Sequence, residues 1–310
     1  MYNRRKFIKN IAASTFFFNW IPKLSESKNN INNNIKYLHK RIPKFDRSIP
    51  CIGMGTWLTF DVAYNTKLIK QRSKVLKAFF DNGGIFIDSS PMYGSSERVL
   101  GKCLSILNKK ESTFSATKIW TPNKWYGKVQ YQNSLSYWGM DKLSLLQVHN
   151  LLNYQDHLDF LFKLKEEKKI DYVGVTTSHG RRHKKLRNIM ENYSLDFIQV
   201  TYNLINRDIE NYILPIAKEK KMGVIANRPF VGGSLFNKIK FKKLPEWGRQ
   251  LGIKSWSELF LKYVVSHEDI TCTIPATTQV KHMEENMRAL KGSLLNKKER
   301  IRLQKYFSEI

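Results

Sequence analysis

The sequence contains few cysteines. Cys51, Cys103 and Cys272 are the only three among 310 residues. Their spacing matches neither a metal-binding motif nor a disulfide framework, because both place cysteines in recurring, closely spaced positions. Isolated cysteines of this kind usually act as small buried hydrophobic side chains. We therefore predict no metal site, and we expect Cys51 and Cys272 to approach each other only if the first and last strands of the fold are neighbours.

Acidic residues are also scarce. The chain has 26 Asp and Glu against 53 Lys and Arg, which gives a formal net charge of +27. Such an excess raises the question of a nucleic acid or an anionic membrane as partner. However, the basic residues are spread along almost the whole length, and no recognition helix, zinc finger or RNP-type pattern accompanies them. We interpret the charge as a compositional bias and expect no nucleic-acid partner.

The apolar run near the N-terminus is too short to span a bilayer. Ile11–Ile21 contains 11 residues and includes Asn19, whereas a transmembrane helix needs about 20. Arg4 and Arg5 precede the run, and this combination resembles a twin-arginine export signal. An ordinary basic amphipathic N-terminus is the alternative. No clean A-x-A cleavage site follows, so removal of the segment and its retention as a membrane anchor both stay open.

Three regions follow from these features. Residues 1–22 are predicted to form the signal segment, and the polar stretch 23–40 is predicted to be a disordered linker, because it is low in complexity and poor in apolar residues. Residues 41–310 are predicted to form a single folded domain, expected to be a monomer. The predicted location is the periplasm or the membrane surface, or the cytoplasm if the signal interpretation is wrong.

Within 41–310, short β-branched runs alternate with helix-length segments such as 66–82. Eight β–α units of this size are typical of a (β/α)8 TIM barrel. A doubly wound open sheet is the alternative, but its glycine-rich G-x-G-x-x-G turn is missing. The predicted strands are 49–57, 85–90, 114–119, 143–150, 172–177, 197–203, 223–230 and 272–278.

Ionisable side chains stand at the ends of three consecutive predicted strands. Asp88 ends the second strand and Tyr93 follows it in "IFIDSSPMYGSSE"; Lys118 lies near the end of the third, and His149 ends the fourth. Because all strands of a parallel barrel end on one face, these side chains should converge there. A solvated strand end explains any one of them, but it does not explain all four together.

These four residue types suit proton donation to a carbonyl oxygen. A tyrosine has a pKa of about 10, and the ammonium group of Lys118 should lower it by favouring the phenolate. Asp88 would hold Lys118 charged and in place, and a neutral His149 would hydrogen-bond to the carbonyl oxygen. Since the set contains no nucleophile or electron source, hydride from a nicotinamide cofactor would complete the reduction.

The segments "GMGTW", "FIDSSPMYGSSE", "SATKIW" and "LLQVHN" resemble the aldo-keto reductase family, and the resemblance runs from about Pro50 to Leu295. It implies a barrel that binds NADPH across its C-terminal face and reduces an aldehyde or ketone to an alcohol. In that comparison Tyr93 is the general acid, Lys118 and Asp88 tune it, and His149 orients the carbonyl group.

The resemblance also implies a cofactor site. Gly55, Thr56 and Trp57 would flank the nicotinamide half, and Gln199 would contact the carboxamide. Glu285 and Asn286 would contact the adenine. The implied cofactor-binding residues are Gly55, Thr56, Trp57, Asp88, Thr176, Thr177, Gln199, Asn227, Arg228, Phe230, Thr277, Thr278, Lys281, His282, Glu285 and Asn286.

The sequence departs from the family pattern at the nicotinamide. Thr176 and Thr177 stand where many members have Ser–Asn. Asn227 and Arg228 stand where an aromatic side chain normally stacks on the ring, so we expect Arg228 near the cofactor's phosphates. Tyr202 is a candidate for the missing stacking contact.

The 2′-phosphate site differs as well. Ala276 and His282 occupy the positions of the family's Lys and Arg, and Lys281 is a candidate replacement. We therefore expect NADP in preference to NAD. The nearby pattern "HGRRHKKLR" (179–187) spaces two histidines four residues apart, but with no third ligand close by it predicts a basic helix start near the cofactor face rather than a metal site.

Two functions stay open. The first is an exported NADPH-dependent carbonyl reductase acting on a small-molecule aldehyde or ketone. The second is a cofactor-binding barrel that serves as a redox-sensing or regulatory subunit. The presence of all four catalytic residue types favours the enzyme.

The export hypothesis predicts that Arg4 and Arg5 are essential as arginines. Replacing both with lysine keeps the charge but removes the pair that this pathway reads. We expect the double variant to stay in the cytoplasm, as measured by cell fractionation and immunoblotting. An unchanged periplasmic yield would contradict the signal interpretation.

Overall fold

The computed structural model describes residues 37–310. The predicted signal segment, and the predicted linker up to residue 36, lie outside the described residues. Within 37–310, no helix has both the length and the apolar character needed to cross a membrane.

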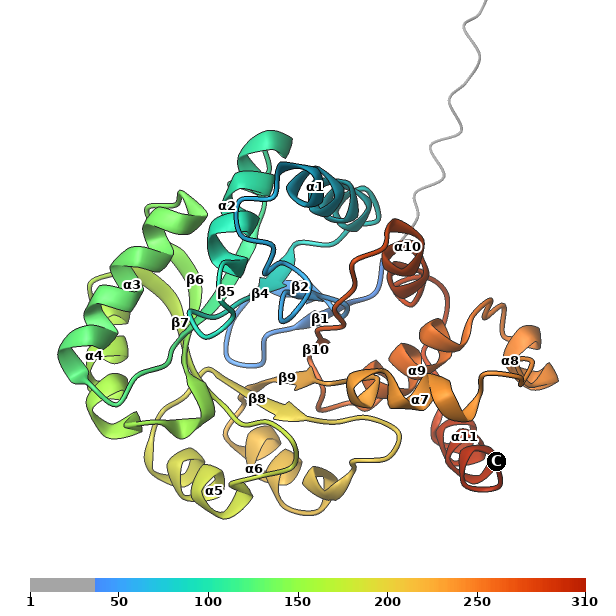
Figure 1. Cartoon of the computed structure of the whole chain (residues 1–310). Helices are drawn as coiled ribbons and strands as arrows, with labels where there is room; N and C mark the ends of the chain where they lie inside the picture. The colour runs from blue at the N-terminus through green and yellow to red at the C-terminus, as the bar shows by residue number, and fades with distance from the viewer. Residues whose placement is uncertain (1–36) are drawn as a thin grey trace, which may run out of the picture. The chain divides into compact units, whose positions relative to one another are not determined.

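A barrel of parallel strands forms the centre of the described chain, and helices surround it (Figure 1). Neighbouring strands follow chain order from β3 to β10, and every pairing among them is parallel. The predicted (β/α)8 barrel is confirmed. Its strands are β3 (Met54–Gly55), β4 (Phe86–Asp88), β5 (Phe114–Ile119), β6 (Leu143–Val148), β7 (Ile170–Thr176), β8 (Phe197–Thr201), β9 (Gly223–Asn227) and β10 (Cys272–Thr273).

The barrel closes where the first and last strands meet. Ile52, just before β3, forms a parallel bridge with Thr273 of β10, and the amide of Gly53 donates to the Thr273 carbonyl at 2.8 Å. Cys51 and Cys272 therefore lie on adjacent segments. Both are buried and free, which agrees with the expectation that they act as hydrophobic side chains.

Helices cover the outside of the barrel because each presents an apolar stripe to the strands. In α1, for example, Asn65 caps the first turn, and Val75, Leu76 and Phe79 are buried. This helix matches the predicted segment 66–82, with Asn82 as the C-cap. The α-helices are α1 (Thr66–Asp81), α2 (Ser96–Leu107), α3 (Lys124–Trp138), α4 (Tyr154–Glu166), α5 (His183–Asn192), α6 (Ile213–Glu219), α7 (Ser234–Lys238), α8 (Glu246–Gln250), α9 (Trp256–Val265), α10 (Val280–Arg288) and α11 (Lys297–Ser308), and the 3-10 helices are η1 (His149–Leu151), η2 (Asp208–Asn211) and η3 (Val231–Gly233).

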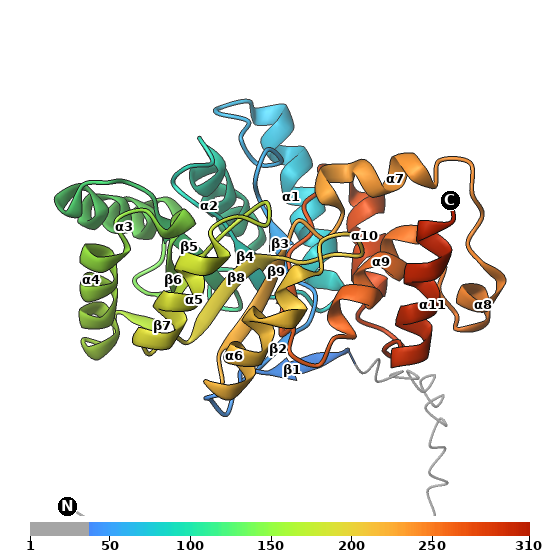
Figure 2. The ribbon, with the colours of Figure 1, turned by 90° about the horizontal axis from the view of Figure 1, so that it is seen from below.

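A hairpin covers the N-terminal end of the barrel. Strands β1 (His39–Arg41) and β2 (Ser48–Pro50) pair antiparallel, and in Figure 2 they lie at the end of the barrel away from α7. Ile42 and Ile49 of this hairpin are fully buried and join the cluster that fills the barrel interior. The predicted first strand, 49–57, is therefore wrong as a single element, and 37–40 belong to the described fold although the linker was predicted to extend to residue 40.

Inward-facing side chains are apolar near the start of β4 and β5 and polar near their C-terminal ends. On β5, Phe114 belongs to the apolar interior cluster, and Lys118 lies four residues further along the same strand. On β4, Phe86 belongs to that cluster and Asp88 follows at the C-terminal end. Because alternate residues of a strand point to the same side, β4 and β5 each supply both a core residue and a residue for the C-terminal face.

Several strands end earlier than predicted. β6 stops at Val148, so His149 begins η1, and β9 stops at Asn227. Beyond these points Asn150 and Arg228 have positive φ angles of 54°, a conformation that breaks extended pairing. The functional candidates at these positions therefore lie on loops at the rim of the barrel.

Candidate active site

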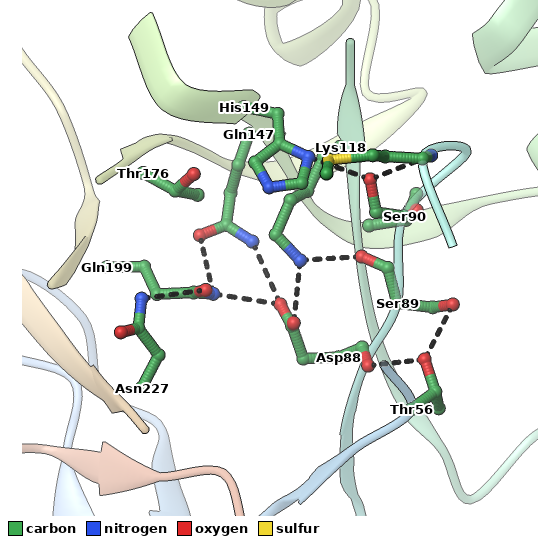
Figure 3. Close-up of polar contacts among 12 residues, drawn as sticks. Thr56, Asp88, Ser89, Ser90, Lys118, Gln147, His149, Thr176, Gln199 and Asn227 are labelled. Atoms are coloured by element: carbon green, nitrogen blue, oxygen red, sulfur yellow. Dashed lines mark hydrogen bonds and ion pairs between the residues drawn. The ribbon is translucent and has the colours of Figure 1, made fainter. Parts of the chain in front are cut away.

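A buried ion pair lies near the C-terminal ends of β4 and β5 (Figure 3). The Lys118 ammonium donates to Asp88 Oδ2 and to the Ser89 carbonyl, both at 2.6 Å, and its side chain is fully buried. Asp88 Oδ1 accepts from Gln147 Nε2 at 3.3 Å and from Gln199 Nε2 at 2.9 Å. Burial alone would lower the pKa of Lys118, but the carboxylate of Asp88 opposes it and the pKa is raised. Lys118 is therefore protonated near neutral pH.

The hydrogen bonds extend from this pair across the neighbouring strands. Asn227 Nδ2 donates to the Thr177 carbonyl at 2.8 Å and to Gln199 Oε1 at 3.4 Å, and Asn227 Oδ1 accepts from the Thr201 hydroxyl at 2.7 Å. Asn227 thus ties the loop after β7 to β8 and β9. Its amide is engaged within the protein, which fixes the side chain rather than leaving it free for a ligand.

Tyr93 stands beside the ion pair. It follows β4 in a turn in which its amide donates to the Ser90 carbonyl at 2.9 Å. The Lys118 ammonium lies 5.0 Å from the centroid of the Tyr93 ring. The ring of His149 packs edge-on against the Tyr93 ring, with 5.7 Å between the two centroids. The sequence-predicted set, including Asp88, therefore lies together on one face.

The expected direction of the Tyr93 pKa is wrong. Burial raises the pKa of the phenol above its ordinary value, and this effect outweighs the Lys118 charge, which lowers it; Asp88 adds to the increase. The prediction considered only the favourable charge and omitted desolvation. Tyr93 therefore keeps its proton near neutral pH.

His149 is neutral and fixed in orientation. Its ring is buried, and Nδ1 lies 2.9 Å from the Ser90 hydroxyl, which also accepts from the Met92 amide. Burial, together with the charge of Lys118, lowers the pKa of His149 to about 2. The Ser90 hydroxyl can donate to Nδ1, which leaves the ring proton on Nε2, where it can be donated to a carbonyl oxygen.

A cavity of about 550 Å³ opens in front of these residues. Tyr93 and His149 line it, whereas Lys118 lies behind them. Many of the predicted cofactor residues also line it, and these are Gly55, Thr56, Trp57, Asp88, Thr176, Thr177, Gln199, Asn227, Arg228 and Phe230.

The remaining predicted cofactor residues lie outside this lining, on the loop after β10 and in α10. Lys281 and His282 are exposed in the first turn of α10, and Asn286 is buried further along the helix. The whole set is Thr277, Thr278, Lys281, His282, Glu285 and Asn286.

The donors of the cavity fit a nicotinamide carboxamide. Thr177 Oγ1 is buried in the cavity wall without a hydrogen-bond partner among the described residues. The neighbouring Thr176 Oγ1 accepts from the Asn150 amide at 3.1 Å and keeps its own hydrogen available. A carboxamide offers both a donor and an acceptor, so these hydroxyl groups match it.

Other cavity residues were not predicted as site residues. They include Ser178, His179, Arg181 and Arg182 in the loop after β7, and Gly232, Gly233 and Phe236 after β9. The sequence pattern predicts that the loop after β7 lies near the cofactor face, but it does not indicate a role for the loop. Its position directly after a barrel strand was the signal that could have identified it.

Tyr202 does not supply the missing stacking contact. It is fully buried outside the cavity lining, and its hydroxyl is hydrogen-bonded to Glu210 and Arg300. His179 and His183 also have separate surroundings, because His179 lines the cavity and His183 bonds to the Tyr212 hydroxyl at 3.1 Å. Residues 37–310 contain no group of three or more His, Cys, Asp or Glu side chains that could hold a metal ion.

The model of the aldo/keto reductase family matches residues 51–306. The chain belongs to the aldo/keto reductase family. Family membership agrees with the resemblance seen in the sequence and places this aldo/keto reductase among the oxidoreductases.

Individual relatives are distant. The chain is 26% identical over 255 residues to the methylglyoxal reductase YeaE of Escherichia coli, which covers 80% of this chain and 88% of the relative. It is 27% identical over 203 residues to the aldo-keto reductase YhdN of Bacillus subtilis, covering 61% of this chain and 60% of that protein. A Klebsiella pneumoniae aldo/keto reductase, solved in complex with NADP and acetate, shares the fold with a TM-score of 0.71 at 24% identity, over 88% of this chain and 95% of that one.

The buried, neutral His149 predicts a component of acid instability. Its pKa is lower in the folded protein, about 2, than in the unfolded chain, about 6.5. The unfolded state therefore binds the additional proton below about pH 6.5, and the stability that the neutral ring contributes above that pH is lost as the pH falls. In urea unfolding, the free energy of wild type relative to His149→Gln should decrease by about 2 kcal/mol between pH 7 and pH 5. Substitution of the exposed His39 by glutamine is the matched control, and parallel pH curves for wild type and His149→Gln would refute the assignment.

Proposed function

We propose that this aldo/keto reductase reduces an aldehyde or ketone to an alcohol with NADPH, and that Tyr93 is the general acid. The observation that carries the proposal is the buried Lys118–Asp88 pair beside Tyr93. Tyr93 lines a cavity that the neutral His149 also lines. An ammonium group next to a phenol stabilises the phenolate that proton donation leaves behind.

The protein residues divide the proton chemistry among them. His149 orients the carbonyl oxygen from Nε2, because Ser90 occupies Nδ1. Tyr93 then gives its proton to that oxygen, and Lys118 becomes the counterion of the phenolate. Asp88 holds Lys118 in position. The bound cofactor supplies the hydride for the carbonyl carbon.

The cofactor would be held from the nicotinamide to the adenine along the C-terminal face. Thr176 and Thr177 would bind the carboxamide, Arg228 the phosphates, and Lys281 with His282 the 2′-phosphate. Support comes from the unpaired Thr177 hydroxyl and from the related Klebsiella pneumoniae enzymes, which were crystallised with NADP or NADPH. Export of the protein by the twin-arginine route remains a separate proposal that rests on Arg4 and Arg5.

Removing the Tyr93 hydroxyl should stop the chemistry and leave cofactor binding intact. Because general acid catalysis contributes about 10²–10⁴-fold, single-turnover hydride transfer by Tyr93→Phe should slow by about that factor. Tyr126→Phe, an exposed tyrosine outside the cavity lining, is the matched control. Lys118→Met should also lose turnover, but it leaves Asp88 buried without its partner, so Tyr93→Phe is the cleaner test.

A rate for Tyr93→Phe within about threefold of wild type lies far outside the general-acid range and would remove Tyr93 from the mechanism. Unchanged NADPH binding together with no carbonyl reduction by the wild type would favour the sensing or regulatory subunit instead.

The 2′-phosphate assignment predicts a preference for NADPH over NADH of about 10-fold in dissociation constant, since exposed charges in water contribute only about 1 kcal/mol each. Lys281→Ala should reduce this preference severalfold, as measured by quenching of protein fluorescence. Lys298→Ala, at the equivalent second position of α11, is the control. Equal affinities for the two cofactors in the wild type would count against the assignment.

A further inference from the structure

The cavity carries a group of basic side chains that the proposed reaction does not use. His179, Arg181 and Arg182 line it from the loop after β7, and we call these three residues the cationic rim. We propose that the cationic rim binds a carboxylate on the substrate, so that the preferred substrates are apolar, for example aromatic, aldehydes or ketones that carry a carboxylate. This inference rests on the proposed carbonyl reduction and specifies its substrate class.

The charges of the rim are unbalanced. Arg181 and Arg182 are exposed and form no ion pair among residues 37–310. Asp88 is the acidic residue of the cavity lining, and Lys118 already neutralises it. Burial, together with the charges of Arg228 and Arg181, lowers the pKa of His179, so its ring is neutral near pH 7 and the charge of the rim comes from Arg181 and Arg182. An anionic group entering the cavity would relieve the repulsion between these charges.

The loop backbone holds the rim in place. The His179 amide donates to the Thr201 hydroxyl at 2.9 Å, and the Arg182 carbonyl accepts from the Leu186 amide at 2.8 Å. His179 and Arg182 have positive φ angles of 60° and 63°, so the loop turns sharply before α5. The two positive φ angles give this turn a defined backbone conformation that differs from that of an extended strand end.

The rim lies next to the residue that would orient the carbonyl. β7 pairs with β6, which His149 follows. The loop after β6 is tied to the β7 side by the bond from the Asn150 amide to Thr176 Oγ1 at 3.1 Å. The phosphates of the cofactor have another candidate partner in Arg228, which follows β9, two strands further round the barrel.

An apolar side of the cavity accompanies the charged one. Trp57 and Leu58, after β3, and Met92, after β4, line the cavity while 42%, 70% and 40% exposed, respectively. Large apolar side chains that stay this exposed together usually mark a binding surface. A substrate with an apolar body and a carboxylate would cover these side chains and also meet the rim.

The test compares two aldehydes that differ in charge, 4-formylbenzoate and its methyl ester, at saturating NADPH. In the wild type kcat/KM should favour 4-formylbenzoate by about 10-fold or more, the lower end for a charge-assisted hydrogen bond. In the double variant Arg181→Gln/Arg182→Gln the ratio should fall to about 1, because the charged hydrogen-bond donors to the carboxylate have been removed. Arg187→Gln is the matched control, since Arg187 lies on α5, the helix that follows the rim, outside the cavity lining, and pairs with Glu191 at 2.8 Å.

Binding measurements separate the substrate from the cofactor as the source of the anion. The dissociation constant of NADPH, from fluorescence quenching, should stay within about twofold in the double variant, because no hydrogen bond to the cofactor is lost. An unaltered preference for 4-formylbenzoate in the double variant, or none in the wild type, would overturn the proposal. A weakened NADPH affinity with an unaltered aldehyde ratio would assign the arginines to the cofactor's diphosphate instead.

If the wild type reduces neither aldehyde, the proposed carbonyl reduction is refuted. Calorimetric titration with benzoate then tests carboxylate binding by the cationic rim without any reaction. Benzoate binding that disappears in the double variant supports a carboxylate site. Equal binding in both proteins, or none, refutes it.

Discussion

The ion pair between Lys118 and Asp88 is the interaction on which the C-terminal half of the barrel depends. Both side chains are buried, and charges removed from water are tolerated only when they are paired and otherwise hydrogen-bonded. Gln147 and Gln199 complete the shell of Asp88, so the pair connects residues of four strands. Losing either charge would leave the other uncompensated, at a cost of about 3–5 kcal/mol.

The same pair determines what Tyr93 can do. Desolvation raises the pKa of the phenol and Lys118 lowers it, so the group is protonated at rest while its anion has a counterion ready. His149 is kept neutral by burial and by the same cation. Burial thereby keeps Tyr93 protonated and His149 neutral, and Lys118 is the counterion available to a phenolate, which makes the site suited to donating a proton rather than to abstracting one.

The two ends of the barrel have different roles. At the N-terminal end, the hairpin residues Ile42 and Ile49 pack with Phe86, Phe114 and other ring side chains into an apolar cluster. At the C-terminal end, strands stop early and polar side chains face a cavity. The apolar end contributes burial of hydrophobic surface, which needs no specific chemistry. The polar end can therefore carry charges and loops that on their own would reduce stability.

Much of this protein could be predicted from its sequence because the determining patterns are local. Alternating β and α segments predict a parallel barrel, and a parallel barrel brings Asp88, Tyr93, Lys118 and His149 to one face. The predicted bounds of a strand were wrong where two parts of one apolar run pair with different strands. The pattern of 49–57 predicts one strand, yet the structure has two short strands there. Ser48–Pro50 pairs with His39–Arg41 in the hairpin, and only Met54–Gly55 pairs with β4 in the barrel.

Local patterns in the sequence were therefore enough to predict the order of the elements, the type of barrel, the family and the residue types at the strand tips. The direction of the Tyr93 pKa depends on the packed structure, since desolvation involves every atom around the hydroxyl group. The tertiary structure also decided that Tyr202 is buried away from the cavity and that Arg181 and Arg182 line it. These outcomes depend on how loops from distant parts of the chain pack at the rim, and no periodicity in the sequence records that packing.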